Sequence, residues 1–243
     1  MSEQDTPNRP APLATPMIQI RLPRPLGAVV LDMDGTVLDT ERVYVQTFCE
    51  TVAQFGHSLP ADFLHTLVGG TREQFQAGLR ARLGEDFPFD AHRQAYLARR
   101  DELLAQGIPM KPGVHELLDT IAALGLKTAI ATASTRVNTE DNLVRAGLRG
   151  RFSVVVTRDD VEHSKPRPDI FLKAAQGIEV APLHCLAVED SHNGVRAAHA
   201  AGMMTVMVPD LMQPNEEVRA LCLAVMEDLH GVRGILTAGQ ARP

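Results

Sequence analysis

The chain has 243 residues, 44% of them hydrophobic, which is enough for one sizeable core and a smaller second unit. Its formal net charge of -6 argues against a nucleic-acid partner, because nucleic-acid binding requires clustered basic residues. No apolar run approaches the roughly 20 residues of a membrane helix, and three widely spaced cysteines fit a reducing cytoplasm. We therefore expect a cytoplasmic protein that binds neither nucleic acid nor membrane, with monomer as the default.

The first 26 residues contain six prolines and no sustained apolar periodicity, so residues 1–26 are predicted to be a flexible tail without chemistry. After this tail, apolar runs of strand length occur at 28–31, 126–131, 154–156, 185–188 and 205–208. Amphipathic stretches between the later runs predict helices at 114–124, 137–146, 169–177 and 194–201. This alternation predicts an α/β fold with a doubly wound, Rossmann-like parallel sheet.

The interval between the first and second predicted strands is too long for one crossover helix. Helical patterns occupy most of it, at about 41–56, 72–83 and 91–106. We interpret residues 42–107 as an inserted α-helical cap domain, and residues 27–41 with 108–243 as the catalytic core. Ligands of such sheets bind beyond the carboxyl ends of the strands, so a cap inserted at that end would cover the site.

Asp32 and Asp34 follow the first predicted strand directly, and Gly35 permits a sharp turn after them. Side chains alternate along a strand, so the two carboxylates project to the same side. Carboxylates this close repel each other unless a cation lies between them or one of them holds a proton. A simple turn would explain Asp34 with Gly35, but it does not explain an acidic residue at the end of a buried strand.

Polar or charged residues also end the second and fourth strands and precede the helix at 169–177. They are Thr132, Ser134, Lys165, Glu189 and Asp190. Taken singly, each has an ordinary alternative as a helix cap, a solvated lysine or a polar loop residue. Together with the two aspartates after the first strand, they set up to four negative charges against one positive charge. Since that cluster would repel a phosphate dianion, we expect a divalent cation, and Mg2+ is the usual choice beside phosphate.

This ordered set of motifs resembles the haloacid dehalogenase-like (HAD) hydrolase superfamily. The resemblance spans residues 27–209 and rests on the motifs Asp32-Met-Asp-Gly-Thr, Thr132, Lys165-Pro-x-Pro-Asp and Glu189-Asp-Ser-x-x-Gly. The segment 37–41 further resembles subfamily I, the branch with an inserted α-helical cap. That branch includes β-phosphoglucomutase, phosphoglycolate phosphatase and sugar-phosphate phosphatases.

The resemblance implies a role for each motif residue. Asp32 would be the nucleophile that forms an aspartyl phosphate, and Asp34 would act first as general acid and then as general base. Mg2+ would be held by Asp32, by the backbone carbonyl of Asp34 and by Asp190, with Glu189 as a ligand or an orienting residue. The phosphate-binding residues would be Thr132, Ala133 and Lys165.

Four other functions share parts of this pattern. A dehalogenase of this fold does not need Asp34, because a departing halide takes no proton. A β-phosphoglucomutase-like phosphomutase shares every core residue, but Tyr44 stands where those enzymes have a hinge histidine. A receiver-type signalling switch also uses a phosphorylated aspartate and Mg2+, but it has about half this length and no cap. A catalytically inactive binding module is expected to lose a core group, and none is missing.

The loop Gly69-Gly70-Thr71-Arg72 resembles the cap loop with which the mutase holds the distal part of its substrate. A capping box from Thr71 to Gln74 is the alternative interpretation. We therefore regard Arg72, Gly69 and Gly70 as candidates for substrate specificity, because arginine suits a second anionic group. The sequence as a whole predicts a Mg2+-dependent phosphatase that acts on a small phosphorylated metabolite, such as a sugar phosphate.

Overall fold

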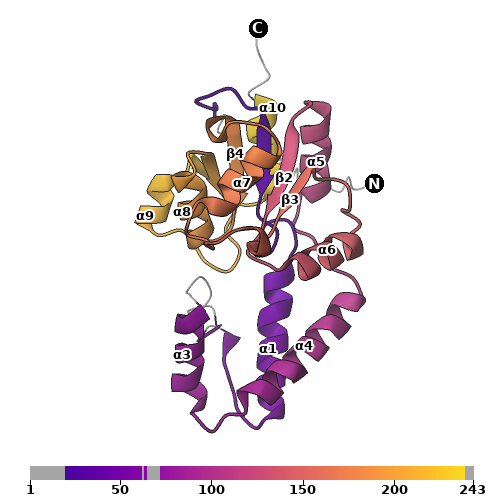
Figure 1. The fold of residues 1–243 in the computed structure, drawn as a ribbon, viewed down its shortest axis with the longest axis vertical. Coiled ribbons are helices and arrows are strands. Elements are labelled where there is room, and N and C mark those ends of the chain that lie inside the picture. The colour runs from indigo at the N-terminus through magenta and orange to yellow at the C-terminus, as the bar shows by residue number, and fades with distance from the viewer. Residues whose placement is uncertain (1–19, 62, 65–71, 239–243) are drawn as a thin grey trace, which may run out of the picture.

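The computed structural model describes residues 20–61, 63–64 and 72–238. A six-stranded parallel sheet in the order β3-β2-β1-β4-β5-β6 forms its centre. The strands are β1 (Ala28–Leu31), β2 (Lys127–Ala131), β3 (Val154–Val156), β4 (Cys185–Glu189), β5 (Met204–Met207) and β6 (Ala224–Val225). Helices cover both faces of the sheet, so the predicted doubly wound α/β fold is confirmed (Figure 1).

The sheet register brings the ends of three strands side by side. Leu31, the last residue of β1, pairs with Ile130 of β2 and with Val188 of β4. The backbone N–H of Asp32 continues this pairing and donates to the carbonyl of Val188 over 3.0 Å. Because these parallel strands end at the same level, the segments that follow them meet at one edge of the sheet.

Successive residues of β1 face opposite layers of the protein, as the strand period requires. Val29 and Leu31 belong to a core with helices α5, α6 and α10, whereas Val30 belongs to a core with helices α7 and α8. These helices are α5 (Val114–Ala123), α6 (Arg136–Arg145), α7 (Asp169–Gly177), α8 (His192–Ala200) and α10 (Leu229–Ala238). Burial on both faces explains why β1 reads as a continuous apolar run.

The sequence analysis assigned no element beyond residue 208, but the structure continues with α9 (Glu216–Leu221), strand β6 and helix α10. Strand β6 has two residues and pairs only with β5. Helix α9 has six residues, capped by the Asn215 side chain, which accepts a hydrogen bond from the N–H of Val218 over 2.9 Å. Elements as short as α9 and β6 carry too few residues for a detectable hydrophobic period. Helix α10 has ten residues and buries Leu229, Val232, Ile235 and Leu236 at helical spacing, a pattern that the sequence analysis overlooked. Short 3-10 turns occur at Arg158–Asp160 and Pro182–His184.

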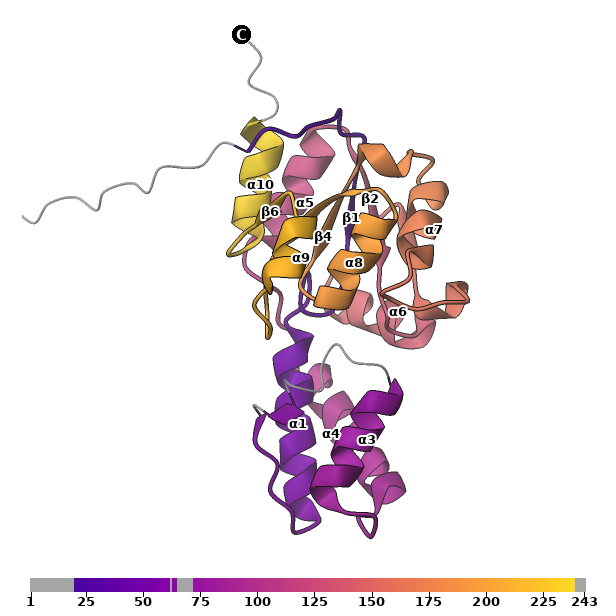
Figure 2. The same cartoon turned by 90° about the vertical axis from the view of Figure 1, so that its left-hand side faces the viewer.

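A second lobe consists of α1 (Thr40–Gln54), α3 (Arg72–Leu83) and α4 (Phe89–Ala105), and it lies at one end of the sheet (Figures 1 and 2). It has its own apolar cluster, and the buried members are Val45, Val52, Leu59, Leu64, Leu79, Leu83 and Phe87. Helix α1 begins two residues before the predicted cap boundary at 42. The domain boundaries stay a prediction, but a separate core is what an independent cap requires. None of the helices in the described ranges is long and apolar enough to cross a membrane.

Two short chain segments connect the lobes and run beside each other. Leu38, on the way out, forms an antiparallel bridge with Met110, on the way back. The N–H of Asp39 donates to the carbonyl of Pro109 over 2.8 Å, and the N–H of Lys111 donates to the carbonyl of Val37 over 3.0 Å. This pairing fixes where helix α1 leaves the sheet, and therefore where its first turns lie relative to the ends of the strands.

Candidate active site

The turn after β1 carries both predicted aspartates and places the segment against β4. Gly35 has φ +84°, a left-handed conformation that favours glycine, and its N–H donates to the carbonyl of Leu38 over 2.8 Å. A Cβ at Gly35 would lie 2.4 Å from Oδ2 of Asp190. The glycine therefore serves two purposes, since it makes the turn and it leaves room for the Asp190 carboxylate.

Lys165 joins the ends of β1, β2 and β4 through one buried ammonium group. Its Nζ donates to Oδ1 of Asp32, to Oε1 of Glu189 over 2.6 Å and to the carbonyl of Ala131 over 2.9 Å. The three charged side chains are almost fully enclosed, with exposed fractions of 7% for Lys165, 8% for Asp32 and 0% for Glu189. Burial alone would lower the pKa of Lys165, but the two carboxylates raise it above its ordinary value, so the ammonium stays charged.

Asp32 is a buried carboxylate with one oxygen left open. Burial raises the pKa of Asp32 well above its usual range, against the opposing charge of Lys165. Within the described ranges, the hydrogen bond found to this carboxylate is the one from Lys165 to Oδ1. Oδ2 accepts none there. The side chain also lines the cavity described below. An oxygen that is accessible from a cavity and has no donor attached is the geometry expected of a nucleophile.

Glu189 is enclosed and fully engaged. Its Oε2 accepts from the N–H groups of Asp190 and Ser191, each over 3.0 Å, and from the Ser191 hydroxyl over 2.9 Å. A Cβ at Gly194 would lie 1.8 Å from the Glu189 carboxylate, so the helix that follows must carry glycine there. Among the two roles predicted for Glu189, this arrangement favours the orienting role, because both oxygens already have partners.

Asp34 accepts hydrogen bonds from four hydroxyl groups. Its Oδ1 accepts from Thr40 over 2.7 Å and from Tyr44 over 3.3 Å, both on α1. Its Oδ2 accepts from Ser134 over 2.7 Å and from Thr132 over 3.4 Å, both beyond the end of β2. One oxygen is therefore held from the cap side and the other from the sheet. The carboxylate orientation depends on both lobes.

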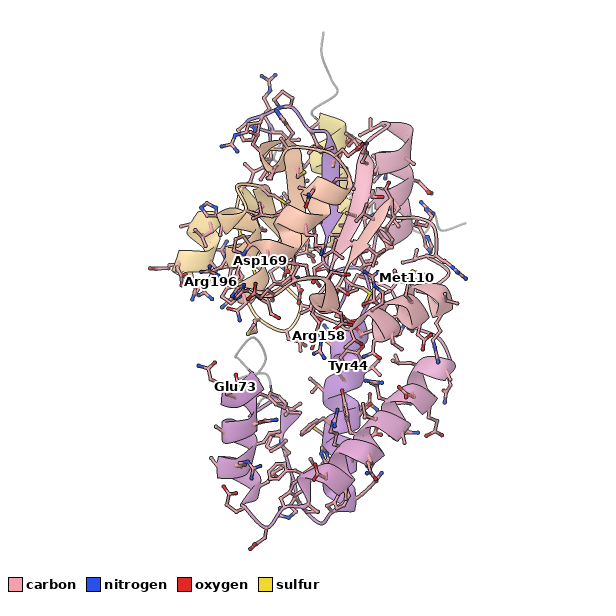
Figure 3. All side chains as sticks on the ribbon, viewed as in Figure 1. Tyr44, Glu73, Met110, Arg158, Asp169 and Arg196 are labelled. Atoms are coloured by element: carbon pink, nitrogen blue, oxygen red, sulfur yellow. The ribbon has the colours of Figure 1, made fainter. Side chains whose placement is uncertain are left out.

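Tyr44 lies where helix α1 meets the sheet lobe, as its label in Figure 3 shows. Its hydroxyl accepts a hydrogen bond from Nδ2 of Asn142 over 3.4 Å while it donates to Asp34. Burial, with the nearby Asp34 charge, raises the pKa of Tyr44 above its ordinary value, so the phenol keeps its proton and can donate. Sequence analysis noted Tyr44 as the hinge position but did not predict its contacts with Asp34 and Asn142.

The predicted Mg2+ ligands fit a hard divalent cation by their chemistry. Asp190 accepts from the Thr36 hydroxyl over 3.2 Å, and burial, then the charges of Glu189 and Asp32, raise the pKa of Asp190 well above its usual range. A cation between the buried carboxylates of Asp32 and Asp190 would relieve this repulsion. Within the described ranges, no three His, Cys, Asp or Glu side chains form a complete metal cage. Backbone carbonyl and water ligands would complete the shell, as Mg2+ commonly accepts.

These groups surround a cavity of about 320 Å³. Its lining includes six of the predicted site residues: Asp32, Asp34, Thr132, Ala133, Lys165 and Asp190. It also includes residues that sequence analysis did not assign to the site: Glu41, Ser191, Asn193, Leu211 and Met212. The predicted Gly69 and Gly70 lie outside the described residues, and so does the side chain of Arg72, whose backbone begins α3.

Comparisons with known proteins now decide the family. The sequence model of a protein family, described as haloacid dehalogenase-like hydrolase, matches residues 29–208. The chain belongs to this family. It is 38% identical over 196 residues to the protein CbbY of Rhodobacter capsulatus, an alignment that covers 76% of this chain and 86% of the relative. It is 27% identical over 178 residues to the phosphorylated carbohydrates phosphatase of Thermotoga maritima, covering 73% and 82% of the two chains.

A solved structure gives the same answer for the fold. CbbY from Rhodobacter sphaeroides in complex with xylulose-(1,5)bisphosphate superposes with a TM-score of 0.70 at 26% identity, covering 84% of this chain and 94% of that one. The predicted HAD family is therefore confirmed. The predicted enzyme class, a phosphatase acting on phosphoric monoesters, is confirmed at that coarse level.

Proposed function

We propose that this enzyme hydrolyses a small phosphomonoester, a sugar phosphate or similar metabolite, through a phosphorylated Asp32. The observation that carries the proposal is the Asp32 carboxylate at the end of β1, with Lys165 on Oδ1 and an open Oδ2 in the cavity. The complex of a relative with a bisphosphorylated sugar and the carbohydrate phosphatase relative support the substrate class.

In the first step, an Asp32 carboxylate oxygen attacks phosphorus, and the bond between phosphorus and the alcohol oxygen breaks. The departing alkoxide takes a proton from the Asp34 carboxyl group and leaves as a neutral alcohol. Asp34 projects from the same turn, two residues after Asp32, and its hydroxyl partners on both lobes hold its orientation. The products of this step are the alcohol and an aspartyl phosphate.

In the second step, water attacks the aspartyl phosphate at phosphorus and gives a proton to the Asp34 carboxylate. The bond between phosphorus and the Asp32 oxygen breaks, which releases phosphate and restores both carboxyl groups. Throughout, Lys165 and the Thr132 hydroxyl lie beside Asp32 and Asp34, where they can offset charge on the transferring phosphoryl group. Ala133, which lines the cavity, is the third predicted phosphate-binding residue.

Mg2+ held by Asp32, the Asp34 carbonyl and Asp190 would supply positive charge beside the phosphoryl oxygens. Glu189 then keeps Lys165 and the backbone of Asp190 in place. We also propose a cytoplasmic protein, on the basis of free cysteines at 49, 185 and 222. The separate apolar cluster of the helical lobe supports 42–107 as its cap, and monomer stays the default prediction.

A panel of phosphomonoesters, assayed for phosphate release with Mg2+ and with chelator, tests the proposal. It contains pentose and hexose phosphates, phosphoglycolate and β-glucose 1-phosphate. We expect Mg2+-dependent release from at least one sugar phosphate, and its loss in Asp32→Asn but not in Asp90→Asn, an exposed acid of α4. Full activity of Asp32→Asn would overturn the nucleophile assignment. Glucose 6-phosphate formed from β-glucose 1-phosphate without net phosphate release would show a mutase instead.

A further inference from the structure

The segment that follows β5 contributes the apolar part of the active-site cavity. Leu211 and Met212 line the cavity together with Asp32, Asp34 and Lys165. Both side chains are half-buried, although they lie in a segment without helix or strand. The phosphate-binding side of the cavity is polar and charged, so these two side chains offer a surface suited to carbon rather than to phosphate.

Anchors on both sides hold this segment in place. The Asp210 side chain has no exposed surface, and its Oδ1 lies 2.9 Å from Nζ of Lys111 and 3.5 Å from a guanidinium nitrogen of Arg42. On the other side, the carbonyl of Gln213 lies 2.9 Å from Nε2 of His192. Leu211 and Met212 therefore sit between two fixed points, which is how a pocket wall keeps its shape.

Leu211 also connects the wall to the cap. It packs against the apolar cluster of the helical lobe, and every other described member of that cluster comes from residues 45–89. It further lines a second hollow together with Val45, Cys49 and Leu59. Leu211 therefore contacts the helical lobe, while its backbone belongs to the sheet lobe.

We propose that Leu211 and Met212 are specificity-determining residues that bind the carbon skeleton of the leaving alcohol. The preferred substrates are then monoesters whose alcohol presents a sugar ring or carbon chain, rather than the smallest alkyl phosphates. The inference rests on the proposed phosphatase function, since it concerns the alcohol that leaves when Asp32 attacks. It assigns part of the specificity to the sheet lobe, independently of the cap loop at 69–72.

The test compares a large and a small ester on the same variants. For Met212→Ala and Leu211→Ala, we expect kcat/KM for the best hexose monophosphate of the panel to fall at least about tenfold, mainly through KM, while methyl phosphate changes less than about twofold. Met212→Leu is expected to retain most of the hexose phosphate activity. Leu183→Ala, an exposed leucine at 44% exposure outside the cavity, is the matched control and should change neither substrate.

Three results would overturn this inference. Equal losses on both esters would show a structural role. Unchanged kinetics in Met212→Ala, whose residue is not among the described members of the helical lobe's apolar cluster, would show no role. A wild-type preference for methyl phosphate over the hexose monophosphate would likewise contradict the inference. By contrast, a wild-type enzyme that releases phosphate from no monoester would overturn the proposed function itself, and this inference with it.

Discussion

Replacing Glu41 with glutamine is expected to stabilise the metal-free protein at pH 8 and to have little effect at pH 4. Glu41 lies in the first turn of α1 and faces the cavity. Burial, then the charges of Asp34 and Asp210, raise the pKa of Glu41 from 4.5 to about 7. Within the described ranges, its carboxylate has no hydrogen-bond or ion-pair partner, so its ionisation in the folded protein is uncompensated.

The sign follows from proton binding. Between pH 4.5 and pH 7 the folded protein binds more protons at Glu41 than the unfolded chain does, so the free energy of unfolding decreases as pH rises. At 1.36 kcal/mol for each tenfold change, the full loss above pH 7 would be about 3 kcal/mol. Because Glu41 is only partly buried and solvent screens its charge, we expect ~1–2 kcal/mol.

Urea unfolding of wild type and Glu41→Gln in chelator, across pH 5 to 8, measures this difference directly. The gap between the two proteins should widen with pH and favour the variant. Glu50→Gln, on the same helix, is the matched control. Hydrogen bonds from Gln46 and Arg99 lower the pKa of Glu50, so this variant should gain no stability as pH rises. A gap for Glu41→Gln that is independent of pH would refute the reasoning.

Three further substitutions test the site. Gly194→Ala is expected to destabilise the protein by about 2–3 kcal/mol and to reduce activity, because its Cβ would displace the Glu189 carboxylate. In the control Gly234→Ala, no described atom beyond its chain neighbours and its own helix backbone lies within 4 Å of the added Cβ, so it should be neutral or stabilising in thermal unfolding. Equal effects of the two substitutions would contradict the account. Asp34→Asn should slow hydrolysis of alkyl phosphates by about 10²–10⁴-fold, but phosphorylation of the enzyme by an aryl phosphate, whose leaving group needs no proton, should be much less affected in stopped-flow assays. Tyr44→Phe removes one of the four donors to Asp34 and should lower kcat several-fold with KM nearly unchanged; an unchanged kcat would show that this hydrogen bond is dispensable.

Residues with distinctive chemistry at strand ends could be predicted from the sequence. Asp32, Thr132 and Asp190 line one cavity, because β1, β2 and β4 are parallel, adjacent and end in register. Lys165 lines the same cavity from the segment between β3 and α7 and contacts Asp32 there. An acidic or hydroxyl residue that interrupts a buried apolar run is visible without a structure. The convergence of these side chains follows from the sheet topology, which strand and helix alternation already predicts.

Other features depend on distances that no local pattern encodes. Glu189 and Asp190 are adjacent acids, and the sequence does not show which of them faces the cavity. The structure distinguishes them, because the Glu189 carboxylate contacts Lys165 and packs against Gly194. Leu211 and Met212 have no chemical signature, so sequence analysis did not select them. Their place after β5, at the carboxyl edge of the sheet, was the one signal that could have found them.

The central claim is that Asp32 carries the phosphoryl group during turnover. Rapid quenching of the enzyme with its best substrate and Mg2+, followed by borohydride reduction and peptide mass spectrometry, tests it most directly. Borohydride reduces an acyl phosphate but not a free carboxylate, so the account predicts homoserine at position 32, formed only with substrate. An actively turning-over enzyme in which Asp32 is always recovered as aspartate, or in which another residue is reduced, would contradict it.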